Sequence, residues 1–306
     1  MGFESIAFAV IGFFAGLAGG MLGIGGSTVL IPALTEFLGP DQHLYQAAAM
    51  IVSFFVTIPA VWEHGKAKAI DGSLVIALIP LALVGIAVGV GISELGVFAG
   101  DGEAYLRGLF GLCLLALCGF DLLRRLRPQR MSTSEPRPAP LDDAGRQGQG
   151  SGLPPSHEPT APPVMGERVA LPGYVRPGRT WPLLAAVALP TGLVAGLLGV
   201  GGGTLAVPLQ QRLLRVPLRS AIANSAVLII ATTPLGAAIK NYAYYAEHRS
   251  FQALMLAAIL IPSAMLGGLL GGRLTHRLPL RAVRATFFVF LLVAALRMIY
   301  GAGRSL

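Results

Sequence analysis

Long apolar segments dominate the sequence and constrain the fold more than any other feature. A membrane-spanning helix needs about 17–25 predominantly apolar residues. Eight segments have this length: 3–22, 46–62, 73–92, 104–123, 182–198, 220–240, 251–271 and 281–301. Two more, 27–38 and 203–214, have only 12 residues each, and each follows a glycine cluster. We therefore predict an all-α polytopic membrane protein with eight full spans plus two short broken or re-entrant helices.

The composition supports a lipid environment. The chain is 54% hydrophobic and only 12% charged, whereas soluble proteins carry about 25% charged residues. This excludes a soluble enzyme and a disordered chain. The net charge of +8 comes from basic residues between apolar segments, which is typical of topology signals. We expect the lipid bilayer as a partner and no nucleic acid, and homo-oligomerisation is left open.

A polar segment separates the apolar segments into two groups. Residues 128–180 contain 11 of the 22 prolines and cannot bury enough apolar surface to fold. We predict a disordered linker here, between a first transmembrane repeat (1–127) and a second (181–306). A simple spacer is the preferred interpretation of the linker.

The two groups of segments resemble each other in sequence. Residues 23–32 read GIGGSTVLIP and residues 199–208 read GVGGGTLAVP, an offset of 176 (199 − 23). The same offset relates Ala47 to Ala223, Thr57 to Thr233, and His64 to Lys240. Each group has five segments, an odd number, so the second group would enter the membrane from the opposite face. The sequence thus predicts two inverted five-segment repeats, an arrangement common among secondary transporters.

The distribution of basic residues predicts the orientation. Lys and Arg follow the third, fifth, seventh and ninth segments, whereas the loops after the second and fourth carry only acidic charges. By the positive-inside rule, the chain is a multi-pass protein of the cell (inner) membrane. Both termini would lie outside and the central linker in the cytoplasm, with Lys240 and Arg249 as exceptions.

The glycine clusters are the main candidates for a binding site. Glycine costs about 1 kcal/mol relative to Ala inside a helix, so several together should break one. Broken backbone within a membrane must line a cavity or pack inside protein, and a free helix N-terminus attracts anions. Close helix packing is the alternative role. The candidates are Gly23, Gly25, Gly26, Ser27 and Thr28, and Gly199, Gly201, Gly202, Gly203 and Thr204. Ser27, Thr28 and Thr204 are placed to cap the resumed helices.

Four further side chains are candidates for contact with an anion. Asn224 and Ser225 are polar groups within an apolar segment, where helix–helix hydrogen bonding is the alternative role. The first repeat has Ala48 and Ala49 at the matching positions, so the site should be asymmetric. His64 and Lys240 are cations at matching repeat positions, with interfacial anchoring as the alternative. We expect no catalytic residues, metal ligands or cofactors.

These motifs resemble the sulfite exporter TauE/SafE family. The resemblance rests on AGLAGGMLGIGGSTVLIPAL (15–34), AGLLGVGGGTLAVPL (195–209) and ANSAVLIIATTPLGA (223–237). It implies movement of sulfite, sulfoacetate or other small sulfur-containing anions across the cytoplasmic membrane, usually outward. The Ala48-Ala49 pair, where the family often has Thr-Ser, and the long linker depart from the family pattern.

We therefore expect a secondary transporter that exports small sulfur-containing anions such as sulfite or organosulfonates. The substrate would be held near the membrane midplane by the two glycine-rich helix breaks. Export of an anion from a negative cytoplasm gains about 2.3 kcal/mol per charge per 100 mV. The alternatives are an intramembrane enzyme, which would need paired acids or a metal cluster, and a non-transporting membrane partner protein.

Overall fold

The computed structural model describes residues 2–98, 100–126, 181–277 and 280–305, and this part of the chain contains helices and no strands. The first group is α1 (Gly2–Leu22), α2 (Ser27–Leu38), α3 (Gln42–Lys66), α4 (Gly72–Ser93), the short 3₁₀ helices η1 (Gly96–Phe98) and η2 (Gly100–Gly102), and α5 (Glu103–Leu126). The second is α6 (Trp181–Leu198), α7 (Gly203–Leu213), α8 (Leu218–His248), α9 (Gln252–Arg277) and α10 (Leu280–Ser305).

Seven of these helices are long and apolar enough to cross a membrane: α3, α4, α5, α6, α8, α9 and α10. The all-helical class predicted from the sequence is therefore confirmed for the described residues, and the seven candidate spans are consistent with a polytopic membrane protein. The eighth predicted span corresponds to α1, whose segment Ile6–Leu22 is a shorter apolar helix, as is α2. The predicted linker, 128–180, lies outside the described residues.

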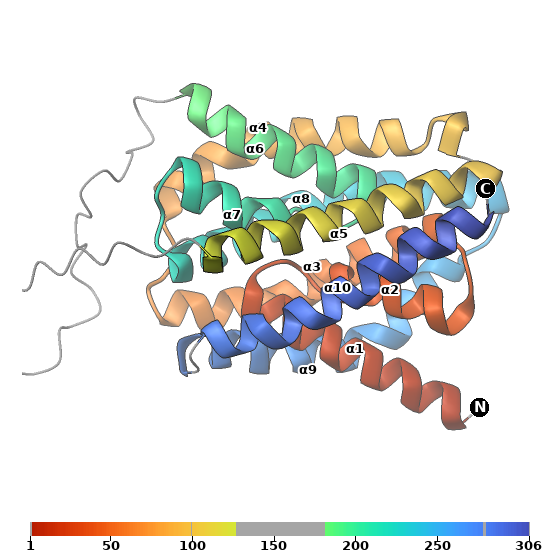
Figure 1. Ribbon diagram of the computed structural model, residues 1–306, viewed down its shortest axis with the longest axis horizontal. Helices are drawn as coiled ribbons and strands as arrows, with labels where there is room; N and C mark the ends of the chain where they lie inside the picture. The colour runs from red at the N-terminus through yellow and green to blue at the C-terminus, as the bar shows by residue number, and fades with distance from the viewer. Residues whose placement is uncertain (1, 99, 127–180, 278–279, 306) are drawn as a thin grey trace, which may run out of the picture.

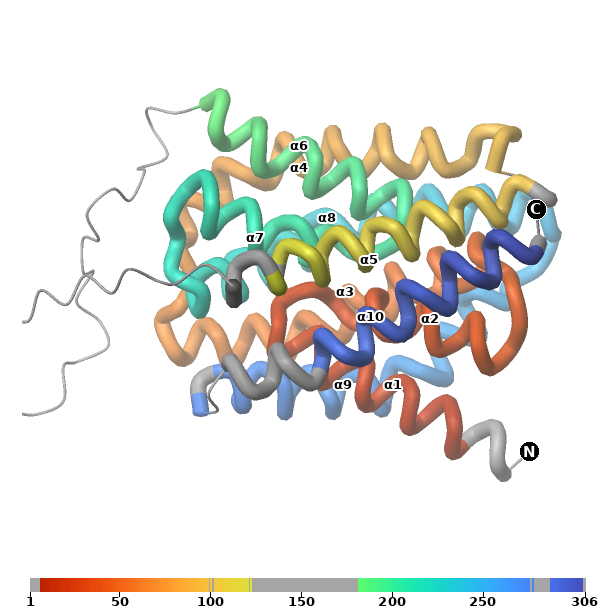
Figure 2. Tube along the Cα trace, in the orientation of Figure 1, coloured from red at the N-terminus to blue at the C-terminus, as the bar shows by residue number. Residues whose placement is uncertain are grey.

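The helices run roughly along the long axis of the molecule (Figure 1). The start of α1 and the end of α10 lie at one end, which we call the terminal end. The end of α5 and the start of α6 lie at the opposite end, the linker end, as the trace in Figure 2 shows. Helix α2 runs back towards the terminal end, and α7 runs back towards the linker end.

Acidic caps set where two of the spans begin. Asp41 accepts a hydrogen bond from Leu44 N (2.9 Å) at the start of α3, and Asp71 accepts one from Leu74 N (3.3 Å) at the start of α4. Each cap satisfies a backbone N–H that the helix leaves free. Helix α3 therefore begins four residues before the apolar segment that predicted it.

Glycines bring helices of the two groups into backbone contact. A Cβ on Gly16 of α1 would overlap the carbonyl of Ala264 in α9, and one on Gly267 would overlap the carbonyl of Phe13. In the same way, a Cβ on Gly192 of α6 would overlap the carbonyl of Ala82 in α4. Small residues allow such close packing in membranes. One helix of each group thus packs against a helix of the other group: α1 packs on α9, and α6 packs on α4.

The centre of the molecule is formed by α3 and α8, which pack against each other and are the most buried of the spans. Helices α5 and α10 form a separate pair. The turns between α1 and α2 and between α6 and α7 approach the central pair, and these turns contain the two glycine clusters.

Candidate functional site

Both glycine clusters interrupt helices through left-handed backbone. Gly23 and Gly25 have φ of +64° and +75° between α1 and α2. Gly199, Gly201 and Gly202 have φ of +71°, +69° and +77° between α6 and α7. Residues with a side chain rarely adopt this conformation, so glycine is needed to turn the chain here.

The predicted side-chain caps of the two short helices do not form. Gly26 is the N-cap of α2 and Gly202 that of α7, so neither cap has a side chain to accept from the first turn. Helix α2 begins at Ser27, directly after its cluster, and α7 begins at Gly203, the last glycine of its cluster, so Ser27, Thr28 and Thr204 lie inside the first turns. The Thr28 hydroxyl instead points back to the Gly25 carbonyl (3.4 Å). The starts of α2 and α7 thus lack the side-chain cap that would compete with a bound anion.

The two breaks meet inside the molecule. A Cβ on Gly203 would overlap the carbonyl oxygen of Gly23 and lie 2.6 Å from Ile24 Cα. A Cβ on Gly25 would lie 3.4 Å from the carbonyl oxygen of Val200. Backbone segments that are about 180 residues apart in sequence are therefore in direct contact.

Ser53 of α3 lies between the two breaks, and the sequence analysis missed it. A Cβ on Gly25 would lie 3.4 Å from Ser53 Oγ, and one on Gly201 would lie 3.4 Å from Ser53 Cβ. Ile229 of α8 borders the same two glycines at 3.6 Å. Ser53 is fully buried and its hydroxyl has no hydrogen-bond partner among the described residues. A polar residue inside an apolar span was the available signal.

Gln46 and Ser225 contact the breaks from the two central helices. Gln46 packs over Gly199, with its Cβ 2.6 Å from where a Cβ of Gly199 would lie, and its amide has no partner within the described residues. The Ser225 hydroxyl lies 2.6 Å from the carbonyl oxygen of Gly23 and 2.8 Å from that of Ile222. Ser225, a predicted site residue, thus fastens the first break to α8, whereas Gln46 was not predicted.

Asn224 makes contacts between helices. Its side-chain oxygen accepts from Asp71 N (2.8 Å), and its side-chain nitrogen donates to Gln210 Oε1 (3.3 Å). It thereby joins α8 to α7 and to the residue that caps α4. These are the helix–helix hydrogen bonds that the sequence offered as the alternative role for this residue.

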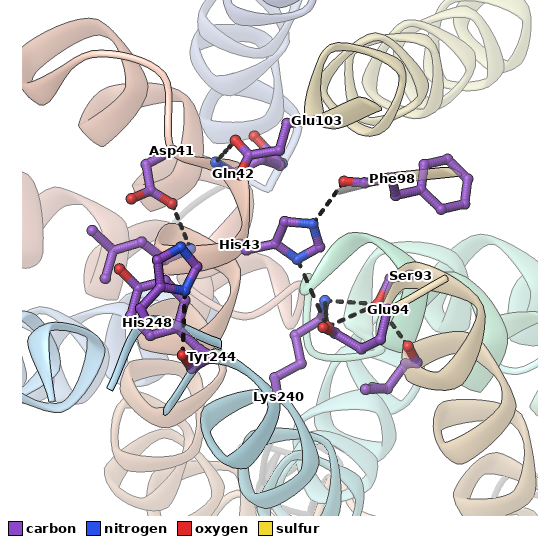
Figure 3. A network of polar contacts seen from close by, with 12 residues as sticks. Asp41, Gln42, His43, Ser93, Glu94, Phe98, Glu103, Lys240, Tyr244 and His248 are labelled. Atoms are coloured by element: carbon purple, nitrogen blue, oxygen red, sulfur yellow. Dashed lines mark hydrogen bonds and ion pairs between the residues drawn. The ribbon is translucent and has the colours of Figure 1, made fainter. Parts of the chain in front are cut away.

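The structure does not bring His64 and Lys240 together. Lys240 lies near His43 at the start of α3 (Figure 3). His64 lies 21 residues further along the same helix (64 − 43), which corresponds to about 30 Å at 1.5 Å per residue. The two cations therefore occupy opposite ends of the bundle, and both are buried.

Lys240 belongs to a cluster of polar side chains at the terminal end. We call His43, Ser93, Glu94 and Lys240 the terminal-end ion cluster (Figure 3). Lys240 Nζ donates to Ser93 Oγ (2.7 Å) and to Glu94 Oε1 (3.0 Å), and His43 Nδ1 lies 3.7 Å from Glu94 Oε1. Burial raises the pKa of Glu94, but His43 and Lys240 outweigh it and lower this pKa to about 2. Glu94 is thus ionised at neutral pH.

A cavity of about 110 Å³ adjoins the two breaks. Ile24 and the hydroxyl-bearing Thr28 and Thr204 line it on one side, and apolar side chains of α5 and α10 line it on the other. The α5 residues lie near the end of that helix and the α10 residues near the start of theirs, so the cavity lies towards the linker end. No group of three or more potential metal ligands occurs in the described part of the chain.

An all-helical bundle with seven candidate spans in its described part, whose interior holds two touching helix breaks, is the architecture of a polytopic membrane protein. The model of the family described as "Sulfite exporter TauE/SafE" matches residues 8–298. The chain therefore belongs to the sulfite exporter TauE/SafE family.

Curated relatives carry transporter names. The chain is 28% identical to "Probable membrane transporter protein MamO" of Magnetospirillum gryphiswaldense. It is also 28% identical to the protein of the same name from Paramagnetospirillum magneticum, and both matches cover 97% of this chain. It spans less than half of these relatives, 45% and 44%. It is 23% identical to "Probable membrane transporter protein YunE" of Bacillus subtilis, over 96% of this chain and 97% of that protein. No solved structure matches the chain.

Proposed function

We propose that this transporter exports small sulfur-containing anions, such as sulfite or organosulfonates, and holds them near the membrane midplane between the two glycine-rich breaks. The observation that carries the proposal is the contact between the breaks, made where two helices begin without side-chain caps. Helix N-termini bind anions through free N–H groups and the positive end of the helix dipole.

An inverted repeat accounts for the way each break is packed. The first break meets α8 at Ile222, and the second meets α3 at Gln46. These two residues are related by the same offset of 176 (222 − 46) as the breaks themselves. The exchange of partners, α1 with α9 and α6 with α4, also fits two copies related by a pseudo-two-fold axis.

Side chains around the breaks would make the site asymmetric. On the α3 side, Ser53 offers a buried hydroxyl without a partner. At the matching position on the α8 side (53 + 176) stands Ile229, which is apolar. An anion between them would receive hydrogen bonds from backbone N–H groups and Ser53, and would place its least polar part against Ile229. In the present conformation the breaks touch, so binding requires the two repeats to move apart.

Export follows from the proposed orientation. With both termini outside, the linker end faces the cytoplasm, and the cavity next to Thr28 and Thr204 lies towards that end. An anion would enter from the cytoplasm, where the membrane potential favours its departure by about 2.3 kcal/mol per charge per 100 mV.

Flux of radiolabelled sulfite in proteoliposomes with an imposed membrane potential tests the proposal. We expect flux that follows the potential and is inhibited by sulfonates. Ser53→Ala should slow this flux, whereas Ser73→Ala should not, because Ser73 is exposed at the start of α4. Absence of flux for every sulfur anion offered would refute the substrate assignment, and equal flux in both serine variants would refute the site.

A further inference from the structure

One face of α3 carries a row of buried polar side chains between the breaks and the terminal end. Gln42, Gln46 and Ser53 are spaced by four and seven residues, so they lie on the same face of the helix. All three are buried, and none of their five side-chain polar atoms has a hydrogen-bond partner among the described residues. Native proteins leave few buried polar groups unpaired, so three in one row are unusual.

The row extends over about half the thickness of a membrane. The 11 residues from Gln42 to Ser53 (53 − 42) cover about 16 Å at 1.5 Å per residue, whereas the hydrocarbon core of a bilayer is about 30 Å thick. Ser53 lies between the two breaks, and Gln46 packs over Gly199 of the second break. Gln42 is the first residue of α3, at the terminal end. The row therefore connects the breaks with that end of the molecule.

The second group of helices shows that packing does not require these polar groups. At the sequence offset of 176, the residues that match the row are apolar, namely Leu218, Ile222 and Ile229 of α8. Ile222 contacts Gly23 of the first break as Gln46 contacts Gly199 of the second. An apolar residue thus serves at the equivalent contact, and the amide of Gln46 has a role other than packing.

Beyond Ser53, towards the linker end, the next polar group of this face is satisfied. The Thr57 hydroxyl lies within hydrogen-bond distance of the carbonyl oxygens of Ser53 and Phe54 in its own helix. The cavity that adjoins Thr28 and Thr204 lies on this side of the breaks. The unpaired atoms of the row thus lie on the terminal side of the breaks, opposite the cavity. Because an amide that stays buried without a partner is unfavourable, we expect these atoms to gain partners in another conformation.

We propose that this face of α3 is the exit half of the transport pathway, along which Gln46 and then Gln42 bind the anion after it leaves the breaks. The inference rests on the proposed function and extends it, because it assigns a route and two residues to the step after the midplane. Each glutamine amide offers two N–H donors to an anion, and the row itself carries no negative charge. In the described conformation Gln46 contacts Gly199, so the second break must move away from α3 to open the route.

Replacing Gln46 with the residue at the matching α8 position tests the route. Gln46→Ile removes the amide, and sulfite flux should fall about tenfold or more because a hydrogen bond to a charged group is lost. The melting temperature should stay unchanged or rise, because the variant removes two buried atoms without partners. Met50→Leu, one turn further along α3 and also buried, is the matched control and should change flux and melting little.

Thiol labelling locates the route without depending on flux. The background is Cys113→Ala/Cys118→Ala, which removes the two native cysteines. Gln46→Cys should react with a membrane-impermeant thiol reagent added on the side that labels Leu95→Cys, an exposed position just after α4. Ala48→Cys is equally buried but lies two residues away on the opposite face of α3, and it should stay unlabelled.

Four results would overturn the inference. Unchanged flux in Gln46→Ile would exclude the amide from the route. A melting temperature that falls together with the flux would give Gln46 a structural role instead. Equal labelling of Ala48→Cys would place the route elsewhere, as would Gln46→Cys that is unlabelled or labelled only from the opposite side. A wild-type protein that moves no sulfur anion, while Gln46→Cys is labelled as expected, would refute the substrate assignment and leave the route standing.

Discussion

Replacing Gly203 with alanine should separate the two helix breaks. The new Cβ would overlap the carbonyl oxygen of Gly23 and lie 2.6 Å from Ile24 Cα, whereas carbon atoms in contact lie about 3.5–4 Å apart. The breaks must therefore move apart by about 1 Å. Overpacking of this kind costs about 1–3 kcal/mol, and the better helix propensity of Ala returns up to about 1 kcal/mol. We expect a net loss of about 1–2 kcal/mol.

Thermal unfolding of the purified protein in detergent measures this loss. At about 2–4 °C per kcal/mol, the melting temperature of Gly203→Ala should fall by about 2–8 °C, and sulfite flux should fall with it. Gly91→Ala is the matched control, because a Cβ on this α4 glycine would meet nothing within 4 Å. The control should melt at or slightly above the wild-type temperature. Unchanged melting and flux in Gly203→Ala would refute the contact between the breaks.

Three further predictions concern buried polar groups. Glu94→Gln leaves the charge of Lys240 buried without its partner. Removing one member of a buried ion pair costs about 3–5 kcal/mol of folding stability. Because the Glu94 side chain is 25% exposed, we expect a smaller loss of stability, about 1–3 kcal/mol. Adding Lys240→Met should restore much of that loss in a double-mutant cycle of melting temperatures, and additive losses would contradict the pairing. The pKa of Glu94 is lowered from 4.5 to about 2, so its ionised form stabilises the fold fully above about pH 4.5. This stabilisation is lost as the pH falls towards 2. Melting temperatures measured across this acid range should show the loss in wild type but not in Glu94→Gln. Ser225→Ala should cost about 1 kcal/mol because its hydroxyl donates its one hydrogen to the carbonyl oxygen of Gly23 or of Ile222. Ser53→Ala should cost less stability but reduce flux more, and the reverse order would exclude Ser53 from the site.

The sequence predicted the helices well because apolar length and glycine clusters are local signals. Each of the ten apolar segments coincides with a helix in the described part of the chain, and both glycine clusters break the chain where expected. The capping of α2 and α7 was predicted wrongly. Gly26 and Gly202 take the N-cap positions themselves, so Ser27 is the first residue of α2 and Thr204 the second residue of α7, and neither can act as the cap.

The polar contacts were harder to predict because they depend on which spans are neighbours. His64 and Lys240 are related by the sequence offset of 176 (240 − 64), but the bundle places them at opposite ends. The partner of Lys240 is Glu94, which lies 146 residues earlier at the end of α4. No local pattern indicates this pair, nor that Ser53 would lie between the two breaks. Such contacts follow from the tertiary arrangement and not from the periodicity of any single helix.

The exchange of helices between the two groups has a consequence for biogenesis. Helix α1 packs on α9, and 229 residues separate the end of one from the start of the other (23–251). At about 5–20 residues per second, the ribosome needs roughly 10–50 s to supply that partner. During this time the glycine-lined face of α1 contacts lipid or the insertion machinery instead of α9. The first group of helices alone is thus an unfinished product, and a chain cut at residues 127–180 should accumulate only when both fragments are made in the same cell.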